Sequence, residues 1–500
     1  MIVDDKLVHS GRHNVGSMAG LVSLESVFCQ NGFFRSHRLK TIKEQFIFFS
    51  KEDLLKKKEE VRTAGRIMRI RNFGRLIFAN IMDETATIQL KVDDDQFFSK
   101  NVGVGDIIGL TGVICKTNKG ELSLQVKNFV LLSKCFKSLP DAHYGFTDIE
   151  ERFRRRYLDF VINPSSRKIL LTRHSLIRFI RSFLDNLGFI EVETPILVSE
   201  ASGAQAQPFV TYHNKLQRNF YLRIATEIPL KQLLVGGFEK VYEIGKVFRN
   251  EGIDARHNPE FTTIEIYQAY ENGGHMMNLT ENLFSFLIDN YPELKQEKRV
   301  NFNSFLIDLS KPFLRVSMIE IVKQYTGIDF SLMKIEQALE LAELHKVFLE
   351  PFQKRSVGQI LITFFETFVE KKIIQPTFVF DYPIEASPLA KRKNNDEKIA
   401  DRFELFIGGL EFANGYSELN DPFEQKRRFE EQIEQKELGN QEIAFFDEDF
   451  VESLEYGMPP AGGLGIGIDR LVMLFTEQNS IKEVIAFPQL KKKMERLKQR

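Results

Sequence analysis

Two arginines in this chain stand where a phosphate group could be held. Arg249 ends an apolar run and is followed by Glu251 in the polar loop RNEGIDARHNPEF. Arg470 follows the glycine-rich stretch GLGIGID, in the first turn of a helix that we expect to begin at Ile468. A guanidinium is planar and permanently charged, so it binds phosphate oxygens in pairs, and the N-terminal end of a helix also favours an anion. The two segments therefore predict a phosphate site.

The strand expected after Arg249 has aromatic, hydroxyl and carboxylate side chains on one face. With the period of two of a strand, Phe261, Thr263, Glu265 and Tyr267 point the same way. The Phe261 ring can stack on a purine, beside a carboxylate and a phenol. A hairpin with an amphipathic outer face would explain Thr263 equally well, but it leaves the dense polar loop before this strand unexplained.

A pair of carboxylates occurs in the segment FELFIGGLEFANGYSELND. Gly408 and Gly409 lie between two apolar runs and predict a two-residue hairpin turn. Counting from this turn places Glu404 opposite Ala413, with Glu404 and Glu411 diagonal on one face. Two carboxylates this close repel each other unless a cation lies between them, so the pattern predicts a magnesium site. The alternative is a charged hairpin that faces solvent.

The second strand of this hairpin has more polar residues at alternate positions. Asn414, Tyr416 and Glu418 share one face. They lie on the face of Glu411 only if one residue is bulged near Ala413, and we predict such a bulge.

Glycines dominate the strand expected before Arg470. They are Gly462, Gly463, Gly465 and Gly467, and the following helix has an apolar stripe of Ile468, Leu471, Val472 and Phe475. Glycines let a ligand approach the backbone closely, although a tight joint between strand and helix is an alternative. Together with two arginines, an aromatic face and a carboxylate pair, the strand predicts an ATP site.

The region from Val61 to Leu132 has another pattern, of short strands with turn signals. We expect strands at 61–71, 76–82, 86–92, 106–114 and 121–131, with a small helix at QFFSKNV. Five strands with a helix between the third and fourth are typical of an OB-fold barrel. The inward residues are expected to be Ile77, Ala79, Ile81, Ile88, Leu90, Val92, Leu122, Leu124 and Val126.

Three outward side chains of this barrel could read a single-stranded base. Phe78 can stack on the base, and Gln89 and Glu121 can bond its edge. A lone surface aromatic is also common, and spacing alone leaves both interpretations open.

The domain boundaries follow from these patterns and from a helix at 165–187. Gly188 ends that helix, and IEVETPIL follows as a strand with Pro195 at its end. Residues 1–50 show no clear period, and 51–60 read as a short charged helix. We expect an N-terminal extension and short helix at 1–60, a barrel at 61–137, a linker at 138–160, a catalytic domain at 161–490 and a basic tail at 491–500.

Composition excludes several classes of protein. The chain has 500 residues, of which 43% are hydrophobic and 27% charged, as in a folded protein of two or three domains. No apolar run approaches the roughly 20 residues that cross a bilayer, and the N-terminus lacks a secretory apolar stretch, so we expect a cytoplasmic protein without a membrane partner. Neither a Rossmann nor a P-loop motif is present. Three scattered cysteines predict buried thiols at Cys29, Cys115 and Cys135.

Basic runs are the remaining candidates for contacts with nucleic acid. They comprise Lys56–Lys58 with Arg62, the arginines of ERFRRRYLDF between the two predicted domains, and Lys491–Lys493 with Arg496, Lys498 and Arg500. For any one run the simpler interpretation is a solvated helix face. The net charge of −1 does not decide the matter, because binding depends on local patches.

Taken together, these segments resemble the bacterial lysyl-tRNA synthetases of class IIb. The helix with EVETPIL resembles motif 1 of that class, FRNEGIDARHNPEF its motif 2 and GLGIGIDR its motif 3, and the resemblance spans about Val61 to Pro488. It implies an α+β fold, in which a five-stranded OB-fold anticodon-binding barrel precedes a class II catalytic domain. That domain is implied to have a six- to seven-stranded antiparallel sheet flanked by helices, and to form a homodimer partly through motif 1.

The resemblance also implies roles for individual residues. Arg249 matches the catalytic arginine on the α-phosphate of ATP and Arg470 the one on the γ-phosphate. The implied ATP-binding residues are Arg249, Glu251, His257, Asn258, Phe261, Glu404, Glu411, Gly467 and Arg470, and Mg²⁺ is implied at Glu404 and Glu411. The implied lysine-binding residues are Gly203, Glu227, Glu265, Tyr267, Asn414, Tyr416 and Glu418. Phe78, Gln89 and Glu121 match the face that binds the central uridine of the anticodon.

The implied reaction joins L-lysine to tRNA(Lys) in two steps. Lysine and ATP give lysyl-adenylate and pyrophosphate, and the 3′-OH of the terminal adenosine then takes the lysyl group. Three carboxylates suit a substrate with two ammonium groups, because a buried carboxylate left unpaired by a neutral amino acid costs several kcal/mol. The alternatives are a class IIb enzyme for aspartate or asparagine, a related enzyme that modifies a translation factor, and a non-catalytic RNA-binding paralogue.

Overall fold

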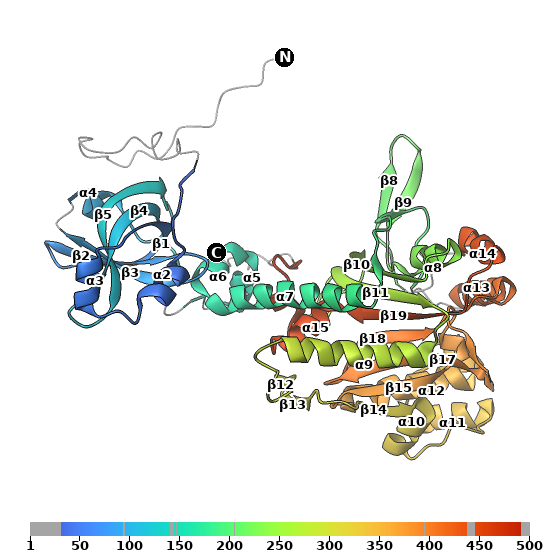
Figure 1. Ribbon diagram of the computed structural model, residues 1–500. Coiled ribbons are helices and arrows are strands. Elements are labelled where there is room, and N and C mark those ends of the chain that lie inside the picture. Colours follow the sequence, from blue (N-terminus) through green and yellow to red (C-terminus); the bar gives the residue numbers. More distant parts are fainter. Residues whose placement is uncertain are drawn as a thin grey trace, which may run out of the picture. The chain divides into compact units, whose positions relative to one another are not determined.

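The computed structural model describes residues 32–93, 96–140, 145–146, 148–204, 206–394, 396–437 and 446–491. The chain divides into two compact units, Met1–Gly145 and Phe146–Arg500 (Figure 1). The expectations for Cys29, for the first 31 residues of the extension and for the basic tail from Lys492 lie outside the described residues.

The first unit is a closed five-stranded barrel. Its strand order is β1-β2-β3-β5-β4, and the helix α4 lies between β3 and β4 in the chain. The bounds are β1 Glu60–Asn72, β2 Leu76–Met82, β3 Thr87–Asp93, α4 Gln96–Asn101, β4 Ile107–Lys116 and β5 Leu122–Ser133. The OB-fold barrel expected from the sequence is confirmed, including the position of its helix.

The core of this barrel is formed by the alternate residues expected to point inward. Those of β2 and β3 are buried, as are Leu122 and Leu124 of β5, while Val126 is partly buried against them. Two short helices, α2 Leu39–Phe46 and α3 Lys51–Lys57, precede the barrel. The helix α3 was expected, but α2 was missed, because only its three buried residues Leu39, Ile42 and Phe46 mark an apolar stripe.

The second unit is built on a nine-stranded sheet, in the order β14-β15-β17-β18-β19-β11-β10-β6, with β16 paired to β17. Its central pairs are antiparallel, whereas β14 pairs with β15 and β6 with β10 in parallel. The expected antiparallel sheet is therefore present, but it has nine strands where six to seven were expected, and a parallel strand lies at each edge. The bounds are β6 Ile190–Glu191, β10 Lys240–Phe248, β11 Glu260–Ala269, β14 Leu314–Ser317, β15 Thr377–Pro383, β16 Arg392–Lys393, β17 Asp396–Ile407, β18 Leu410–Ser417 and β19 Ala461–Gly467.

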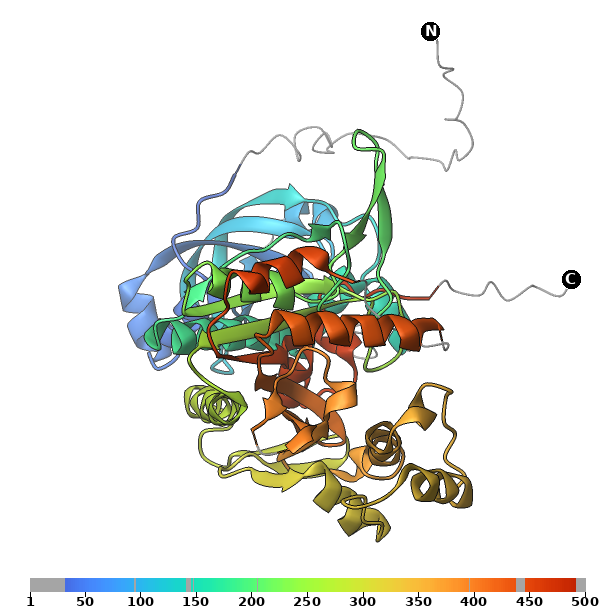
Figure 2. The ribbon, with the colours of Figure 1, turned by 90° about the vertical axis from the view of Figure 1, so that its right-hand side faces the viewer.

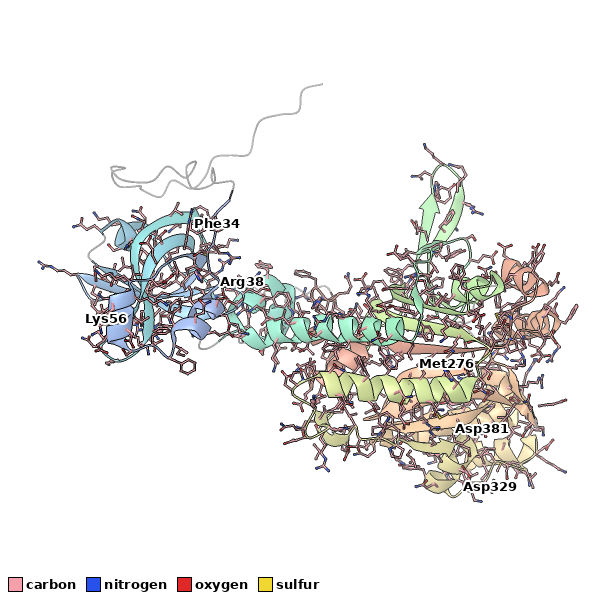
Figure 3. The ribbon with its side chains drawn as sticks, in the orientation of Figure 1. Phe34, Arg38, Lys56, Met276, Asp329 and Asp381 are labelled. Atoms are coloured by element: carbon pink, nitrogen blue, oxygen red, sulfur yellow. The ribbon has the colours of Figure 1, made fainter. Side chains whose placement is uncertain are left out.

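Helices cover one face of this sheet. Figure 1 shows α7 and α9 as long helices, and Figure 2 shows α9 end-on. Alternate residues of the central strands form the main core with α7 Pro164–Asn186, α9 Gly273–Asn290, α15 Ile468–Phe475 and α16 Ile481–Val484. Met276 of α9 lies in this core at Gly462 (Figure 3). The residues between them in sequence point to the opposite face, which is free to carry polar groups.

The remaining elements surround the sheet. Three helices with their own apolar core, α10 Met318–Thr326, α11 Ile335–Leu344 and α12 Val357–Phe368, pack near β15. The others are β7 Leu197–Val198, β8 Val210–His213, β9 Arg218–Leu222, α8 Glu227–Val235, β12 Arg299–Phe302, β13 Phe305–Asp308, α13 Pro422–Glu437 and α14 Glu448–Glu455. Within the described ranges, no helix is both long and apolar enough to span a membrane.

The strand expected at IEVETPIL is mostly wrong. Only Ile190–Glu191 pair with the sheet, as β6, and β7 begins at Leu197. Between them, Thr194 donates its backbone N–H and its hydroxyl to Glu243 Oε2, at 3.1 and 2.6 Å. Pro195 has no N–H to donate. The backbone therefore leaves the strand ladder to bond a side chain.

The arginine run lies in two helices at the start of the second unit, and two of its arginines are not solvated. It forms α5 Ile149–Arg154 and α6 Arg156–Ile162, so part of the expected linker is helical. Arg156 is fully buried and paired with Asp159, and Arg152 lies 3.0 Å from both Asp159 Oδ1 and Glu483 Oε2. A solvated face is therefore the wrong interpretation for these two arginines, which link the helices to α16.

Candidate active site

The hairpin that carries Glu404 and Glu411 has its turn at the position predicted from the sequence. Gly408 and Gly409 have φ values of +60° and +74°, the left-handed conformation of both central residues of a tight hairpin turn. Phe406 pairs with Glu411, as expected from counting back from that turn.

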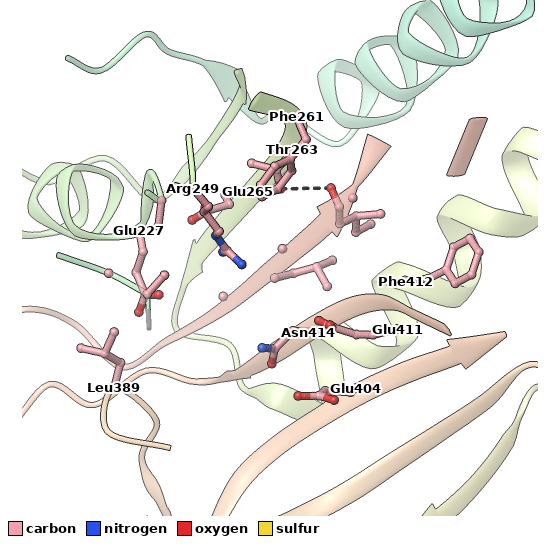
Figure 4. Close-up of a pocket in the computed structure, with 18 of the residues that line it drawn as sticks. Glu227, Arg249, Phe261, Thr263, Glu265, Leu389, Glu404, Glu411, Phe412 and Asn414 are labelled. Carbon is pink, nitrogen blue, oxygen red and sulfur yellow. Dashed lines mark hydrogen bonds between the residues drawn. The ribbon is translucent and has the colours of Figure 1, made fainter. Parts of the chain in front are cut away.

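A bulge then changes the register of the hairpin. Leu405 pairs with Ala413, so Phe412 is the extra residue on β18, and the predicted bulge is present. Its consequence is that Glu404 pairs with Asn414, and the expected pairing of Glu404 with Ala413 is wrong. In Figure 4 Phe412 points away from the carboxylates, whereas Asn414 lies beside Glu404.

The glycine strand β19 lies between two strands that bear functional groups. Gly463 is paired with Tyr267 on one side and Tyr416 on the other, and Gly465 with Glu265 and Asn414. A Cβ atom on Gly463 would lie 1.8 Å from Glu418 Oε1, so only glycine fits there. The bare strand therefore leaves room for the side chains of its neighbours.

These strands enclose a cavity of about 750 Å³ on the face of the sheet opposite the main core. Its walls bring together segments more than 250 residues apart in the chain, from Gly203 to Arg470. Figure 4 shows Glu227, Arg249 and Glu411 among the side chains that line it. The expected site residues that line it are Gly203, Glu227, Arg249, Glu251, His257, Asn258, Phe261, Glu265, Tyr267, Glu404, Glu411, Asn414, Tyr416, Gly467 and Arg470. Glu418 is buried behind Gly463 and does not line the cavity.

One end of the cavity holds Arg249. Its guanidinium carbon lies 5.2 Å from the centre of the Phe261 ring. The Nε atom is buried and has no hydrogen-bond partner. A buried donor without a partner is costly, so this group is suited to an anionic ligand.

The place of Arg470 in α15 is fixed by contacts of the preceding residue, Asp469. Asp469 pairs with Arg173 of α7, and Asp469 Oδ2 accepts from the Thr262 backbone N–H at 2.7 Å. Arg470 itself donates to the backbone oxygen of Glu411 at 2.6 Å, and its Nη1 lies 3.5 Å from Glu411 Oε2. The arginine is thus fixed beside one of the two carboxylates.

The polar loop before β11 is held by its own side chains. Asn258 is buried and donates to the Glu260 backbone oxygen at 2.6 Å. His257 Nδ1 lies 2.9 Å from Asp254 Oδ2. Burial would raise the pKa of Asp254, but hydrogen bonds from His257 and nearby backbone amides lower it to about 2. Glu251 and His257 remain exposed at the cavity wall.

Glu404 already has partners that the sequence analysis missed. Arg402 pairs with Glu404 Oε1, and the Tyr382 hydroxyl donates to Oε2 at 2.8 Å. Burial, opposed by the charge of Arg402 and reinforced by that of Glu411, raises the pKa of Glu404 to about 7. Repulsion within the carboxylate pair is therefore not by itself an argument for a metal ion. The position of Arg402, two residues before Glu404 on the same strand face, was the signal available in the sequence.

The opposite end of the cavity is acidic and contains a lysine that was also missed. Lys231 Nζ lies 2.6 Å from Glu227 Oε1 and 2.5 Å from Glu418 Oε2. The Tyr416 hydroxyl also donates to Glu227 Oε1, at 2.7 Å. The spacing of four residues between Glu227 and Lys231, which is that of neighbours on a helix, was the available signal.

The third carboxylate at this end, that of Glu265, accepts hydrogen bonds from uncharged donors. Glu265 Oε1 accepts from the Thr226 backbone N–H at 3.1 Å, and Oε2 from the Tyr267 hydroxyl at 3.0 Å. Burial, and then the charge of Glu227, raises the pKa of Glu265.

The barrel of the first unit presents a separate candidate surface. Phe78 is half-buried on the outer face of β2, paired with Arg71 of β1 and Lys91 of β3. The Phe73 ring meets Phe78 edge-on, with 6.1 Å between centres. Gln89 accepts from Ser123 at 3.0 Å. An aromatic ring between two cations has the properties of a surface for single-stranded nucleic acid.

The two units match two known families. Residues 148–491 match a family described as tRNA synthetases class II (D, K and N), and residues 61–132 match an OB-fold nucleic acid binding domain.

Curated relatives match most of the chain. A lysine–tRNA ligase of Mycoplasma mycoides subsp. mycoides SC is 51% identical over 466 residues, covering 91% of this chain and 92% of the relative. Lysine–tRNA ligases of Staphylococcus epidermidis and Bacillus subtilis are 49% and 47% identical, covering 92% of this chain and 94% and 93% of their own lengths.

Proposed function

The chain belongs to the class II tRNA synthetases, among the lysine–tRNA ligases, and from this we propose how its residues attach lysine to tRNA. The enzyme catalyses two steps. The lysine carboxylate attacks the α-phosphorus of ATP, which forms lysyl-adenylate and releases pyrophosphate. The 3′-OH of the terminal tRNA adenosine then attacks the adenylate carbonyl, which forms lysyl-tRNA and releases AMP.

The observation that carries the assignment of residues is that three carboxylates gather at one end of the cavity and two arginines at the other. Glu227, Glu265 and Glu418 gather at one end, and Arg249 and Arg470 lie on the walls of the other. In the proposal, the acidic end takes the two ammonium groups of lysine, with Gly203, Tyr267, Asn414 and Tyr416 around the side chain. The lysine carboxylate then points toward the arginines.

We assign ATP to the basic end. Arg249, whose Nε is buried without a partner, binds the α-phosphate, and Arg470 binds the γ-phosphate. Phe261 stacks on the adenine, and Gly467, Glu251, His257 and Asn258 complete the wall. No side-chain nucleophile is required, because the reaction depends on positioning and on neutralising phosphate charge.

The same proposal places Mg²⁺ at Glu404 and Glu411. Their carboxylates line the cavity on adjacent strands, and oxygen donors suit this ion, which is commonly held by one or two carboxylates together with substrate phosphates. A bound ion would neutralise phosphate charge. The contact of Glu404 with Arg402 makes Glu411, whose side chain is 41% exposed, the more accessible ligand.

We assign the anticodon to the barrel surface formed by Phe78, Gln89 and Glu121. In the proposal Phe78 stacks on the central uridine, and Gln89 and Glu121 bond the edge of the base. Arg71 and Lys91, which flank Phe78, would attract the RNA backbone.

Replacing Phe78 with alanine tests this assignment. We expect kcat/KM for tRNA charging to fall about 10- to 100-fold, because base–aromatic stacking is worth ~1–3 kcal/mol. Lysine-dependent pyrophosphate exchange without tRNA should be unchanged. Phe48→Ala removes a fully solvated phenylalanine of the same unit and serves as the control. Equal loss of charging and exchange would contradict the anticodon role.

The subunit arrangement and location are also proposals. Exposed apolar residues cluster where α7 ends and the sheet edge begins, at Leu187, Ile190, Ile196 and Leu197. We propose that this edge joins two copies of the chain, since a short edge strand with apolar neighbours favours association. Sedimentation should give twice the mass of one chain, and the mass of a single chain would contradict the proposed dimer.

We place the enzyme in the cytoplasm, with tRNA and ATP. Recovery of the enzyme only with membranes on cell fractionation would contradict this location.

The alternatives from the sequence are less consistent with this cavity. An enzyme for aspartate or asparagine needs a cationic end to hold the substrate side chain, whereas here that end has three carboxylates and one lysine. A translation-factor-modifying relative lacks the barrel that is present here. Arg249, Arg470 and the carboxylates of Glu227, Glu265, Glu404 and Glu411, which a non-catalytic paralogue would have lost, all line the cavity.

A further inference from the structure

Lys231 is an ionisable group that the reaction as described does not use. It lies in the second turn of α8, and its side chain is fully buried. Its ammonium bridges Glu227 and Glu418, which come from segments almost 200 residues apart in the chain. Burial would lower the pKa of Lys231, but the charges of Glu227 and Glu418 outweigh it and hold the pKa above its usual value. The group is therefore a fixed positive charge.

We propose that Lys231 is a positioning residue for lysine selection, which acts as a permanent counter-charge beneath the substrate pocket. When all three are ionised, Glu227, Glu265 and Glu418 carry three negative charges, and the ammonium of Lys231 balances one of them. Lysine brings two ammonium groups. This inference rests on the proposed function of the cavity.

The contacts also show how Lys231 orients its partners. It binds Glu418 through Oε2, which turns Oε1 toward Gly463 at the cavity wall. Both oxygens of Glu418 are buried without a hydrogen-bond partner among the described residues; Oε2 forms the ion pair with Lys231, whereas no ion pair is formed by Oε1. A buried acceptor in this state is suited to a donor from a bound ligand. Lys231 thus leaves one oxygen of Glu418 available and takes the other.

On the second partner, Lys231 shares an oxygen with a residue of the cavity wall. Glu227 Oε1 accepts from both Lys231 and the Tyr416 hydroxyl. The ammonium also lies 5.6 Å from the centre of the Tyr416 ring. One lysine therefore sets the positions of Glu227, Glu418 and Tyr416, which together surround the pocket assigned to lysine.

The first test replaces Lys231 with methionine, which keeps the length of the side chain but removes its charge. Without the cation, Glu418 is left as an uncompensated buried carboxylate and no longer presents a fixed, charged acceptor. In pyrophosphate exchange we expect KM for lysine to rise at least ~10-fold, whereas KM for ATP changes less than ~2-fold. Lys391→Met is the matched control, because Lys391 lies near the cavity and bonds the amide of Asn420.

The second test separates charge from packing with the pair Lys231→Met and Glu418→Gln. The double variant keeps the carboxylates of Glu227 and Glu265, so its net pocket charge equals that of the unaltered enzyme, in which Lys231 offsets one of three carboxylates. If Lys231 acts as a counter-charge, adding Lys231→Met to the Glu418→Gln variant should raise KM for lysine less than ~3-fold. The reason is that the effects of substituting two interacting residues are not additive. The double variant also removes both members of the buried pair, so it is expected to fold even if Lys231→Met alone does not.

Two results would overturn the inference. One is an unchanged KM for lysine in Lys231→Met, and the other is the same fold-increase in both backgrounds, which would mean that Lys231 only fills space. Absence of lysine-dependent exchange in the unaltered enzyme would instead contradict the proposed function. The two failures are therefore distinguishable.

Discussion

Replacing Arg249 with alanine is expected to reduce lysine-dependent pyrophosphate exchange by at least ~10³-fold, because a fixed cation at the reacting phosphate would be lost. Arg249 lines the cavity with its Nε buried and unpartnered, and its guanidinium lies on the Phe261 ring. Its buried Nε has no hydrogen bond to lose, so the loss should appear in kcat and not in the thermal stability of the fold. Exchange of labelled pyrophosphate into ATP measures the step directly.

A second stacked arginine supplies the control for this experiment. Arg218 lies 4.7 Å from the centre of the Phe220 ring, but it is on the exposed strand β9 and does not line the cavity. Arg218→Ala should retain exchange. Near-normal exchange in Arg249→Ala, with Arg218→Ala also active, would contradict the assignment of the α-phosphate to Arg249.

Replacing Glu411 with glutamine is expected to lower exchange at least ~10²-fold at low Mg²⁺, because a direct ligand of the proposed ion would lose its charge. Excess Mg²⁺ should restore part of the rate, since the remaining ligands, Glu404 and the phosphates of ATP, still bind it. Titration of the exchange rate with Mg²⁺ gives the shift in half-saturation. Removal of Mg²⁺ with a chelator should stop exchange in the unaltered enzyme.

Glu397 provides a matched carboxylate. It lies on the same strand as Glu404 but is exposed and outside the cavity. Glu397→Gln should leave the Mg²⁺ dependence unchanged. The same Mg²⁺ dependence in Glu411→Gln and the unaltered enzyme would rule out Glu411 as a ligand. Glu411 is the better test than Glu404, because Glu404→Gln would also free Arg402 and Tyr382.

Local periodicity in the sequence was sufficient to predict the faces of the main strands. The alternation in β2 and β3 identified the barrel core, and the two glycines after Ile407 identified the hairpin turn. The bulge followed from a consistency argument, because Asn414 and Tyr416 had to share a face with Glu411. Such features depend on neighbours in the chain or on one adjacent strand, so a pattern of a few residues contains them.

Ion pairs between residues that are far apart in the chain could not be predicted from local sequence patterns. Arg156 looked like part of a solvated basic run, yet it is buried against Asp159 and reaches Glu483 more than 300 residues away. Lys231 pairs with Glu418 in the same way. Sequence spacing gives the side of a helix on which a charge lies, but tertiary packing decides whether that side is buried. The helices α10 to α12, which have a separate core of their own, were not predicted, although α10 begins with a capping box of Ser317 and Glu320 and ends with Gly327 as its C-cap.

The same limit applies to the argument for the metal site. From the sequence, repulsion between two carboxylates required a cation, and Mg²⁺ was the only one considered. The structure provides protein cations at both, Arg402 at Glu404 and Arg470 at Glu411. The assignment of Mg²⁺ therefore rests on the position of the carboxylates at the proposed phosphate end, and the Glu411→Gln titration tests that position.

The central claim is that the acidic end of the cavity selects lysine. Pyrophosphate exchange by the unaltered enzyme, measured separately with each of the twenty amino acids, tests it most directly. Three carboxylates with one fixed counter-charge predict exchange with lysine and none with neutral or acidic amino acids, because a neutral or acidic side chain would leave buried negative charge uncompensated. Exchange with aspartate or asparagine, and none with lysine, would contradict the account.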